Sequence, residues 1–233
     1  MSIKYTYPNN NYSYSNLIKN NYRRKSELNF KIVKNGLILP LTSKETFSGQ
    51  TGGVIDSSGN CIEESLTIRT NPFIKNKFYK TWFVGLNKKP FKDFSNLKIK
   101  KKKVIYIGAL PAHYGHFIFE GLSRVWIKKL FNPKEFLFVY ISRLNQESHL
   151  LEIFTLLGIP KENIIKIETP TKFEQIIVPE PSLRLNDYYH EDFRKSVAVN
   201  YKQNKKNKKI FFTRSNKNGR SFGQFFIDKL MFN

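Results

Sequence analysis

Three polar residues, His116, Glu120 and Arg124, follow one another at intervals of four. In an α-helix this spacing aligns the three side chains in one stripe, each within reach of the next. A carboxylate one turn from a histidine fixes the tautomer of the imidazole and raises its basicity, so His116 with Glu120 has the make-up of a general base. The apolar residues of the segment fall on another helix face, so the core does not need the stripe. The competing interpretation is an ordinary surface pair between Glu120 and Arg124.

Three further residues are candidates for binding anions. His113 lies at the expected start of the same helix, where free backbone N–H groups favour a bound anion. Arg214 and Arg220 follow a strand predicted at 210–213. Two guanidinium groups at the carboxyl end of a buried strand suit a diphosphate, which they can bind bidentately. The alternative is a polar turn after the strand.

The second half of the chain alternates strand patterns with helix patterns. A continuous apolar run at 104–107 is typical of a strand buried on both faces. Further strands are predicted at 136–141, 164–167 and 175–178, with helices at 114–131, 146–157 and 191–201. This alternation indicates an α/β fold with a parallel sheet, whose ligand site lies at the carboxyl ends of the strands. The loop at 108–113 occupies that position, just before the polar stripe.

Three regions are expected along the chain. Residues 1–27 are rich in Asn, Tyr and Ser and predict a flexible N-terminal arm. Residues 28–201 predict a β-rich leader, with a hairpin around the turn at 56–60, followed by the α/β unit. Residues 202–233 predict a lysine-rich linker and the first strand of a second α/β domain.

The chain has 233 residues and a net charge of +22, from 40 Lys and Arg against 18 Asp and Glu. The lysine clusters at 98–103 and 202–209 precede predicted strands, and we interpret both as solvated lead-in segments. Arginine, the residue best suited to phosphate and base contacts, is sparse beside lysine, so nucleic acid is not favoured as a partner. Attraction to the anionic inner face of a membrane is expected, at about 1 kcal/mol for each basic residue near the surface.

Several classes of protein are excluded by what the sequence lacks. The single cysteine, Cys61, excludes a disulfide scaffold and a cysteine-based zinc finger. There is no P-loop, no nucleophile elbow and no H-E-x-x-H pattern, so neither a metal nor a cofactor is expected. No apolar run is long enough to span a membrane, and the N-terminus has no secretory signal pattern. We therefore expect a cytoplasmic protein that can associate with the inner membrane face.

Five segments, taken in order, resemble glycosyltransferase family 61, which includes capsular-polysaccharide-type transferases. No single segment is specific, but five in order over roughly 50–220 are. They are Gly-Gly-Val-Ile-Asp at 52–56 with Glu-Glu-Ser-Leu at 63–66, Tyr-Gly-His-Phe-Ile-Phe-Glu at 114–120 with Arg124, Leu-Gly-Ile-Pro-Lys-Glu-Asn-Ile-Ile at 157–165, Phe-Glu-Gln-Ile-Ile-Val-Pro at 173–179, and Ile-Phe-Phe-Thr-Arg at 210–214.

The resemblance implies a GT-B-type architecture with a Rossmann-like, acceptor-side N-terminal domain. It also implies inverting, metal-independent transfer of a sugar from a nucleotide-sugar donor to a glycan or lipid-linked acceptor in surface polysaccharide synthesis. On this resemblance His116 is the base, oriented by Glu120, and Arg124 matches the family's basic residue. Arg214, with Arg220, would face the donor phosphates. The family's donor-binding half normally continues well past 210–214, so a truncated or split member is expected.

Two other functions stay open. The first is a non-catalytic sugar-binding half that docks on a separate chain carrying the donor domain. The second is a basic protein that binds nucleic acid or a membrane surface. A steep loss of DNA binding with rising salt would be required of a nucleic-acid binder.

Overall fold

The computed structural model describes residues 22–41, 52–70, 78–80, 94–110, 117–142, 148–184 and 188–198. The chain divides into two units, Met1–Val199 and Asn200–Asn233, and all described residues belong to the first. Glu120 and Arg124 are therefore described, whereas four other predicted site residues lie outside the described residues: His113, His116, Arg214 and Arg220. Most of the predicted arm at 1–27 and all of the region at 202–233 also lie outside them.

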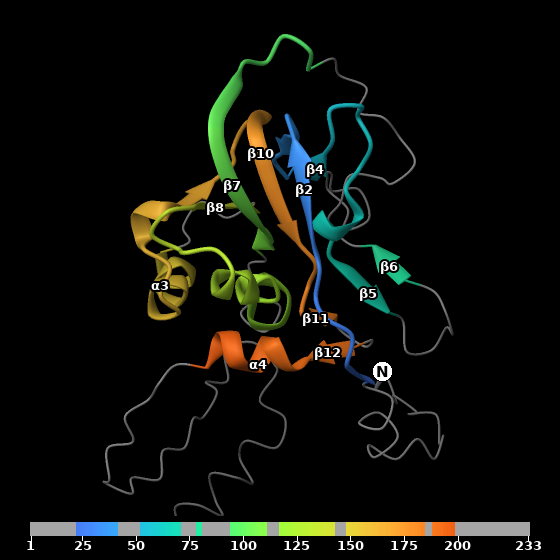
Figure 1. Cartoon of the computed structure of the whole chain (residues 1–233), viewed down its shortest axis with the longest axis vertical. Coiled ribbons are helices and arrows are strands. Elements are labelled where there is room, and N and C mark those ends of the chain that lie inside the picture. The colour runs from blue at the N-terminus through green and yellow to red at the C-terminus, as the bar shows by residue number, and fades with distance from the viewer. Residues whose placement is uncertain are drawn as a thin grey trace, which may run out of the picture. The chain divides into compact units, whose positions relative to one another are not determined.

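A seven-stranded mixed sheet forms the centre of the described part (Figure 1). Its order is β4-β3-β10-β7-β8-β9, and β2 also pairs with β10. Strands β10, β7, β8 and β9 are parallel to one another, whereas β2 and β3 pair antiparallel with β10 and β4 pairs antiparallel with β3. The strands are β2 (Phe30–Lys34), β3 (Leu37–Leu39), β4 (Gly53–Ile55), β7 (Ile99–Leu110), β8 (Leu137–Ser142), β9 (Ile164–Lys166) and β10 (Thr171–Pro179). The predicted combination of helices with a multi-stranded sheet is confirmed, but the sheet is mixed and not wholly parallel, because β2, β3 and β4 pair antiparallel.

Strand β7 runs through the middle of this sheet, and it is longer than predicted. Its second half, from Val104 to Leu110, is buried throughout, as the apolar run predicts. Its first half, from Ile99 to Lys103, is exposed but still belongs to the strand, because Ile99 and Lys100 pair with Lys172 and Phe173 of β10. The lysines at 100–103 are thus part of the sheet and not only a lead-in to it.

Apolar side chains are buried on both faces of the sheet because residues alternate along each strand. One cluster joins Ile105 and Ile107 of β7 to Phe138 of β8 and to Phe154 of helix α3 (Ser148–Leu156). Helix α4 (Glu191–Val197) packs on the same side through Phe193 and Val197. The other cluster contains the alternate residues of the same strands, among them Val104, Tyr106, Val139, Ile176 and Val178. The continuous apolar pattern of β7 follows from this two-sided burial.

The helix predicted at 114–131 is not a single α-helix. The described part contains a π-helical turn, η3 (Phe117–Gly121), and a 3₁₀ helix, η4 (Val125–Lys129), with a turn between them. The other two helix predictions are confirmed with shorter bounds, as α3 and α4. Gly158 follows α3 with φ of +87°, the left-handed conformation in which glycine commonly ends a helix.

Smaller elements border the sheet. Strands β1 (Tyr22–Arg24), β12 (Tyr188–His190) and β11 (Leu183–Arg184) form a second sheet in that order, and β5 (Ile68–Thr70) pairs with β6 (Phe78–Lys80). Two short 3₁₀ helices are η2 (Glu63–Ser65) and η5 (Lys161–Asn163). The hairpin predicted around 56–60 is confirmed by the pairing of Ile55 with Cys61. Within the described ranges, no helix has both the length and the apolar character that crossing a membrane requires.

Candidate active site

The candidate site lies where three parallel strands end. Strands β7, β8 and β10 end at Leu110, Ser142 and Pro179, and the Ser142 hydroxyl donates to the Leu110 carbonyl across 3.2 Å. Carboxyl ends of parallel strands meet at one edge of a sheet, which is where α/β proteins commonly bind ligands. The segments that follow two of these strands, 117–124 and 180–184, contact each other through the Ser182 N–H, which donates to the Ser123 carbonyl at 2.7 Å.

The π-helical turn η3 contains Glu120, the middle residue of the predicted stripe, and precedes Arg124. The Leu122 N–H donates to the Phe117 carbonyl, five residues back, at 3.0 Å. A π-turn holds one residue more than an α-turn and so rotates the following residues by about 100°. Phe117 anchors the turn in the core, where its ring packs edge-on against Phe154 at 5.7 Å. Glu120, within this turn, is 5% exposed, and Arg124, just after it, is only 1% exposed.

Arg124 binds backbone carbonyls that come from two distant segments. Its Nη2 donates to the carbonyls of Glu64 and Leu66, both at 2.7 Å. Its Nε donates to the Pro179 carbonyl at 3.1 Å and to that of Glu64 at 3.2 Å. Glu64 and Leu66 belong to the end of η2, where helical carbonyls lack partners within the helix. The guanidinium therefore ties η2 to the end of β10, and burial lowers its pKa.

Gly108 provides the space that this guanidinium occupies. It lies at a register shift between β7 and β8 and has φ of +102°, a conformation that side chains other than glycine rarely adopt. A Cβ atom built at Gly108 would lie 2.8 Å from Nη1 of Arg124. The glycine is thus required twice, by its backbone conformation and by its close neighbour.

Two expectations about the stripe are therefore wrong. Glu120 and Arg124 are buried, so they are not the surface ion pair of the competing interpretation. Arg124 is also part of the core, contrary to the expectation that the core does not need the stripe. The predicted spacing assumes a regular α-helix with a free polar face, whereas this segment forms a π-turn and a 3₁₀ helix, and Arg124 lies between η2 and the end of β10. The hydrogen bonds of Arg124 show a structural role, in which it links η2 to the end of β10. Its predicted role in binding the donor stays a prediction.

Glu120 lines a small cavity beside Arg124. The cavity measures about 10 Å³, which is room for roughly one water molecule. Its walls are formed by Thr67, Glu120, Ser123, Arg124, Pro181, Leu183 and Arg184. The Ser123 hydroxyl is turned toward the Glu120 backbone carbonyl, to which it donates at 2.7 Å. A sugar or nucleotide is too large for this cavity and would have to bind outside it.

Next to the cavity is an arginine and tyrosine cluster that sequence reasoning missed. The guanidinium carbons of Arg24 and Arg184 lie 5.2 and 5.3 Å from the ring centre of Tyr188. Arg24 also holds Glu180 through two hydrogen bonds of 3.0 and 2.8 Å. Burial raises the pKa of Tyr188, whose hydroxyl donates to the Pro181 carbonyl. Arg184 could have been found from its place just after the strand predicted at 175–178.

The described residues show no group of three or more His, Cys, Asp and Glu side chains suited to holding a metal ion. Comparisons of the chain with protein-family models, with curated proteins and with solved structures each found no match. The resemblance to glycosyltransferase family 61 consequently rests on the five sequence segments alone.

Proposed function

We propose that this chain is an acceptor-side domain of a GT-B-type glycosyltransferase, with a Rossmann-like fold. It transfers a sugar from a nucleotide-sugar donor to a glycan or lipid-linked acceptor in surface polysaccharide synthesis. The observation that carries the proposal is the buried carboxylate of Glu120, held at the carboxyl edge of parallel strands four residues after His116. The mixed α/β sheet supports it, because ligands of such sheets bind at that edge.

The proposed reaction is a direct displacement with inversion. His116 takes the proton of the acceptor hydroxyl as its oxygen forms a bond to the anomeric carbon of the donor sugar. The bond between that carbon and the diphosphate breaks at the same time, and the electron pair leaves with the nucleotide diphosphate. Glu120 orients the His116 imidazole and stabilises its positive charge. Arg214 and Arg220 stabilise the negative charge of the departing diphosphate, and no metal takes part.

Burial suits Glu120 to an orienting role better than to direct contact with a sugar. The carboxylate lies beside Arg124, whose charge interacts with it. Arg124 is itself held by three backbone carbonyls, so the carboxylate lies next to a fixed cation. A base partner held in one position avoids the cost of reorganisation during the proton transfer.

The test is binding and turnover of UDP- and GDP-sugars by the wild-type chain, by three site variants and by one control variant. His116→Ala and Glu120→Gln should lower hydrolysis or transfer by about 10²-fold or more while leaving donor binding nearly unchanged. Arg214→Ala should weaken donor binding. Glu152→Gln, at an exposed carboxylate of α3, is the matched control and should behave like the wild type. Turnover should persist in EDTA.

Each outcome of this test has a definite meaning. A wild-type chain that neither binds nor turns over any of these donors overturns the proposal. Binding without turnover would favour the sugar-binding half that docks on a separate donor-domain chain. Equal activity of wild type and Glu120→Gln would remove Glu120 from the mechanism.

We further propose that the protein associates with the inner membrane face through lysines 100–103, which are exposed along the first half of β7. Each lysine near an anionic surface contributes about 1 kcal/mol. Sedimentation with phosphatidylglycerol vesicles, compared with phosphatidylcholine vesicles, tests this. Binding that is equal for both lipids, or that survives glutamine at all four positions, would contradict it.

A further inference from the structure

Within the described residues, strand β2 is paired along one side and open along the other. It pairs antiparallel with β10 from Phe30 opposite Pro179 to Lys34 opposite Gln175. Among the strands of the described residues, none pairs with its other side. Backbone N–H and C=O groups alternate between the two sides of a strand, so an edge strand presents a row of them to a further strand.

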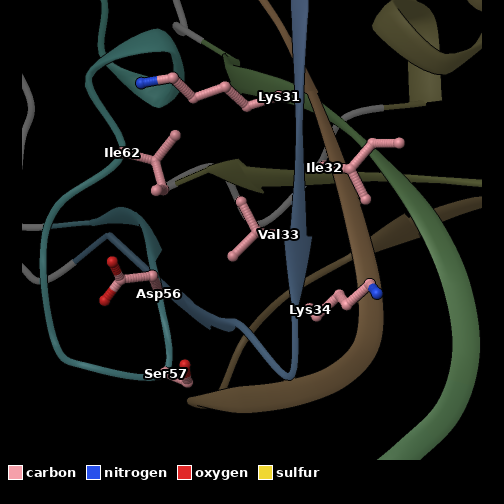
Figure 2. A pocket seen from close by; sticks show the side chains of 7 residues that line it. All are labelled: Lys31, Ile32, Val33, Lys34, Asp56, Ser57 and Ile62. Atoms are coloured by element: carbon pink, nitrogen blue, oxygen red, sulfur yellow. The ribbon is translucent and has the colours of Figure 1, made fainter.

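A cleft of about 550 Å³ runs along this open side. It is lined by Lys31, Ile32, Val33 and Lys34 of β2, and by Asp56, Ser57 and Ile62 of the neighbouring hairpin (Figure 2). Figure 2 shows Lys31 and Val33 on one side of the strand and Ile32 and Lys34 on the other. Four consecutive residues with alternating side chains can all line one cleft only where it follows the edge of their strand.

The chemistry of the cleft is apolar in the middle and basic at both ends. Ile32 is 53% exposed, although it is a large apolar side chain, and Val33 and Ile62 form the apolar floor on the other side. Lys31 and Lys34 stand at the two ends of this apolar pair. Lys31 also pairs with Glu64 at 2.9 Å, and its side chain remains 54% exposed.

The carboxylate of Asp56, the acidic residue of the cleft, accepts hydrogen bonds from its own turn. One carboxylate oxygen of Asp56 accepts from the backbone N–H groups of Ser58 and Asn60, at 2.9 and 2.8 Å. The other accepts from the Asn60 side chain at 3.0 Å. Asp56 therefore serves its own turn, while Lys31 and Lys34 lie on opposite faces of β2 at the two ends of the cleft.

We propose that the open edge of β2 binds an extended acidic peptide segment of another protein, which adds to the sheet as a further strand. The matching segment has the order acidic, apolar, apolar, acidic. Its apolar residues lie opposite Ile32 and Val33, and its carboxylates opposite Lys31 and Lys34. Cross-strand pairs of opposite charge and of apolar residues are those that stabilise a sheet, and strand addition is a common mode of peptide recognition.

Charge argues against a second copy of this chain as the occupant. The net charge of +22 makes two copies repel each other. An antiparallel pair of β2 strands centred on Ile32 and Val33 would also set Lys31 of each copy opposite Lys34 of the other. Like charges directly opposite are destabilising in a sheet. The partner is therefore acidic.

The probe is the blocked peptide Thr-Glu-Val-Val-Glu-Thr, with fluorescein at one end, titrated with the wild-type chain while anisotropy is followed. The same residues in the order Thr-Val-Glu-Glu-Val-Thr are the sequence control and should bind at least several-fold more weakly. Two further versions carry N-methyl groups on alternate residues, in opposite phases. One phase removes the N–H groups that face β2 and should abolish binding, while the other phase should retain it.

Lys34→Glu tests the protein side of the contact. It exchanges an attraction for a repulsion and should weaken binding of the first peptide roughly two- to thirtyfold. Lys134→Glu, at another exposed lysine, changes the net charge equally and should leave binding nearly unchanged. Since Lys34 is exposed, circular dichroism of the variant should match the wild type. No binding, equal loss for both lysine variants, or equal binding of both N-methyl versions overturns the proposal.

Discussion

Gly108 and Arg124 fill one space between them. The guanidinium of Arg124 lies so close to Gly108 that Nη1 is 2.8 Å from the position of a Cβ there. The Arg124 side chain cannot move away from this position without breaking hydrogen bonds, because three backbone carbonyls accept from its Nε and Nη2 atoms. A substitution at either residue should therefore disturb the packing of the other, and both residues lie next to the candidate site.

Gly108→Ala should lower the free energy of unfolding by about 2–4 kcal/mol, measured by urea denaturation. One part is backbone strain at φ of +102°, and the other is the clash with Arg124. Gly59→Ala separates the two parts, because Gly59 has φ of +84° but no atom within 4 Å of its Cβ position. Its cost should be limited to strain, about 1 kcal/mol. Equal costs for the two variants would contradict the close contact.

Arg124→Lys should lower the free energy of unfolding by about 2–4 kcal/mol, although it keeps the charge. A single ammonium cannot reproduce the planar fork that reaches the carbonyls of Glu64, Leu66 and Pro179, and buried carbonyls without partners are costly. Arg23→Lys is the matched control, since Arg23 is exposed and pairs with Glu191 at the surface. That change should cost less than about 1 kcal/mol. A loss of less than about 1 kcal/mol in the unfolding free energy of Arg124→Lys would show that these hydrogen bonds are not needed for stability.

Combining Gly108→Ala with Arg124→Ala should be less damaging than the sum of the two single changes. Removing the guanidinium removes the atom that the new methyl group meets, so only the backbone strain is left at position 108. A double-mutant cycle should therefore give a coupling of about 0.5–3 kcal/mol. Strict additivity would mean that the two residues do not share this space.

Glu120→Gln should keep the shape of the buried side chain but remove its charge. If the carboxylate orients His116, the rate of transfer should fall by about 10²-fold or more while the affinity for the donor changes little. The pH dependence of the rate should shift as well, because the imidazole loses its negative neighbour. Glu152→Gln should change neither. A variant that loses folding and activity together would indicate a structural role only.

Asp56 should contribute stability that disappears in acid. Slight burial alone would raise its pKa, but hydrogen bonds from Asn60, Ser58 and Gly59 outweigh that effect and lower the pKa below the ordinary value of 3.8. A carboxyl whose pKa is lowered by folding stabilises the folded state fully above its unfolded pKa. That stabilisation is lost as the pH falls through the lower folded value. Asp56→Asn should therefore reduce stability at pH 7 and make less difference near pH 2, as followed by thermal unfolding.

The local pattern of residues was enough to predict individual elements. The apolar run at 104–107 predicted a strand buried on both faces, and the Asp, Gly and Asn residues at 56–60 predicted the hairpin turn. Gly158 marked the end of a helix through the left-handed conformation that glycine adopts readily. Each of these signals arises within a few residues and depends on periodicity or backbone preference, so it can be recognised without knowing the fold.

The surroundings of the candidate site depended on contacts between distant segments. Glu120 and Arg124 stood out by type and spacing, but both are buried, because their segment packs against distant parts of the chain. The carbonyls that hold Arg124 lie 55 to 60 residues away along the chain. The sequence by itself determined where most strands and helices form and which residue types could act as acids, bases or anion-binding groups. Only the tertiary structure decided which of these residues are buried. Burial and hydrogen-bond partners depend on packing between segments that are far apart in the sequence, and a local residue pattern carries no information about that packing.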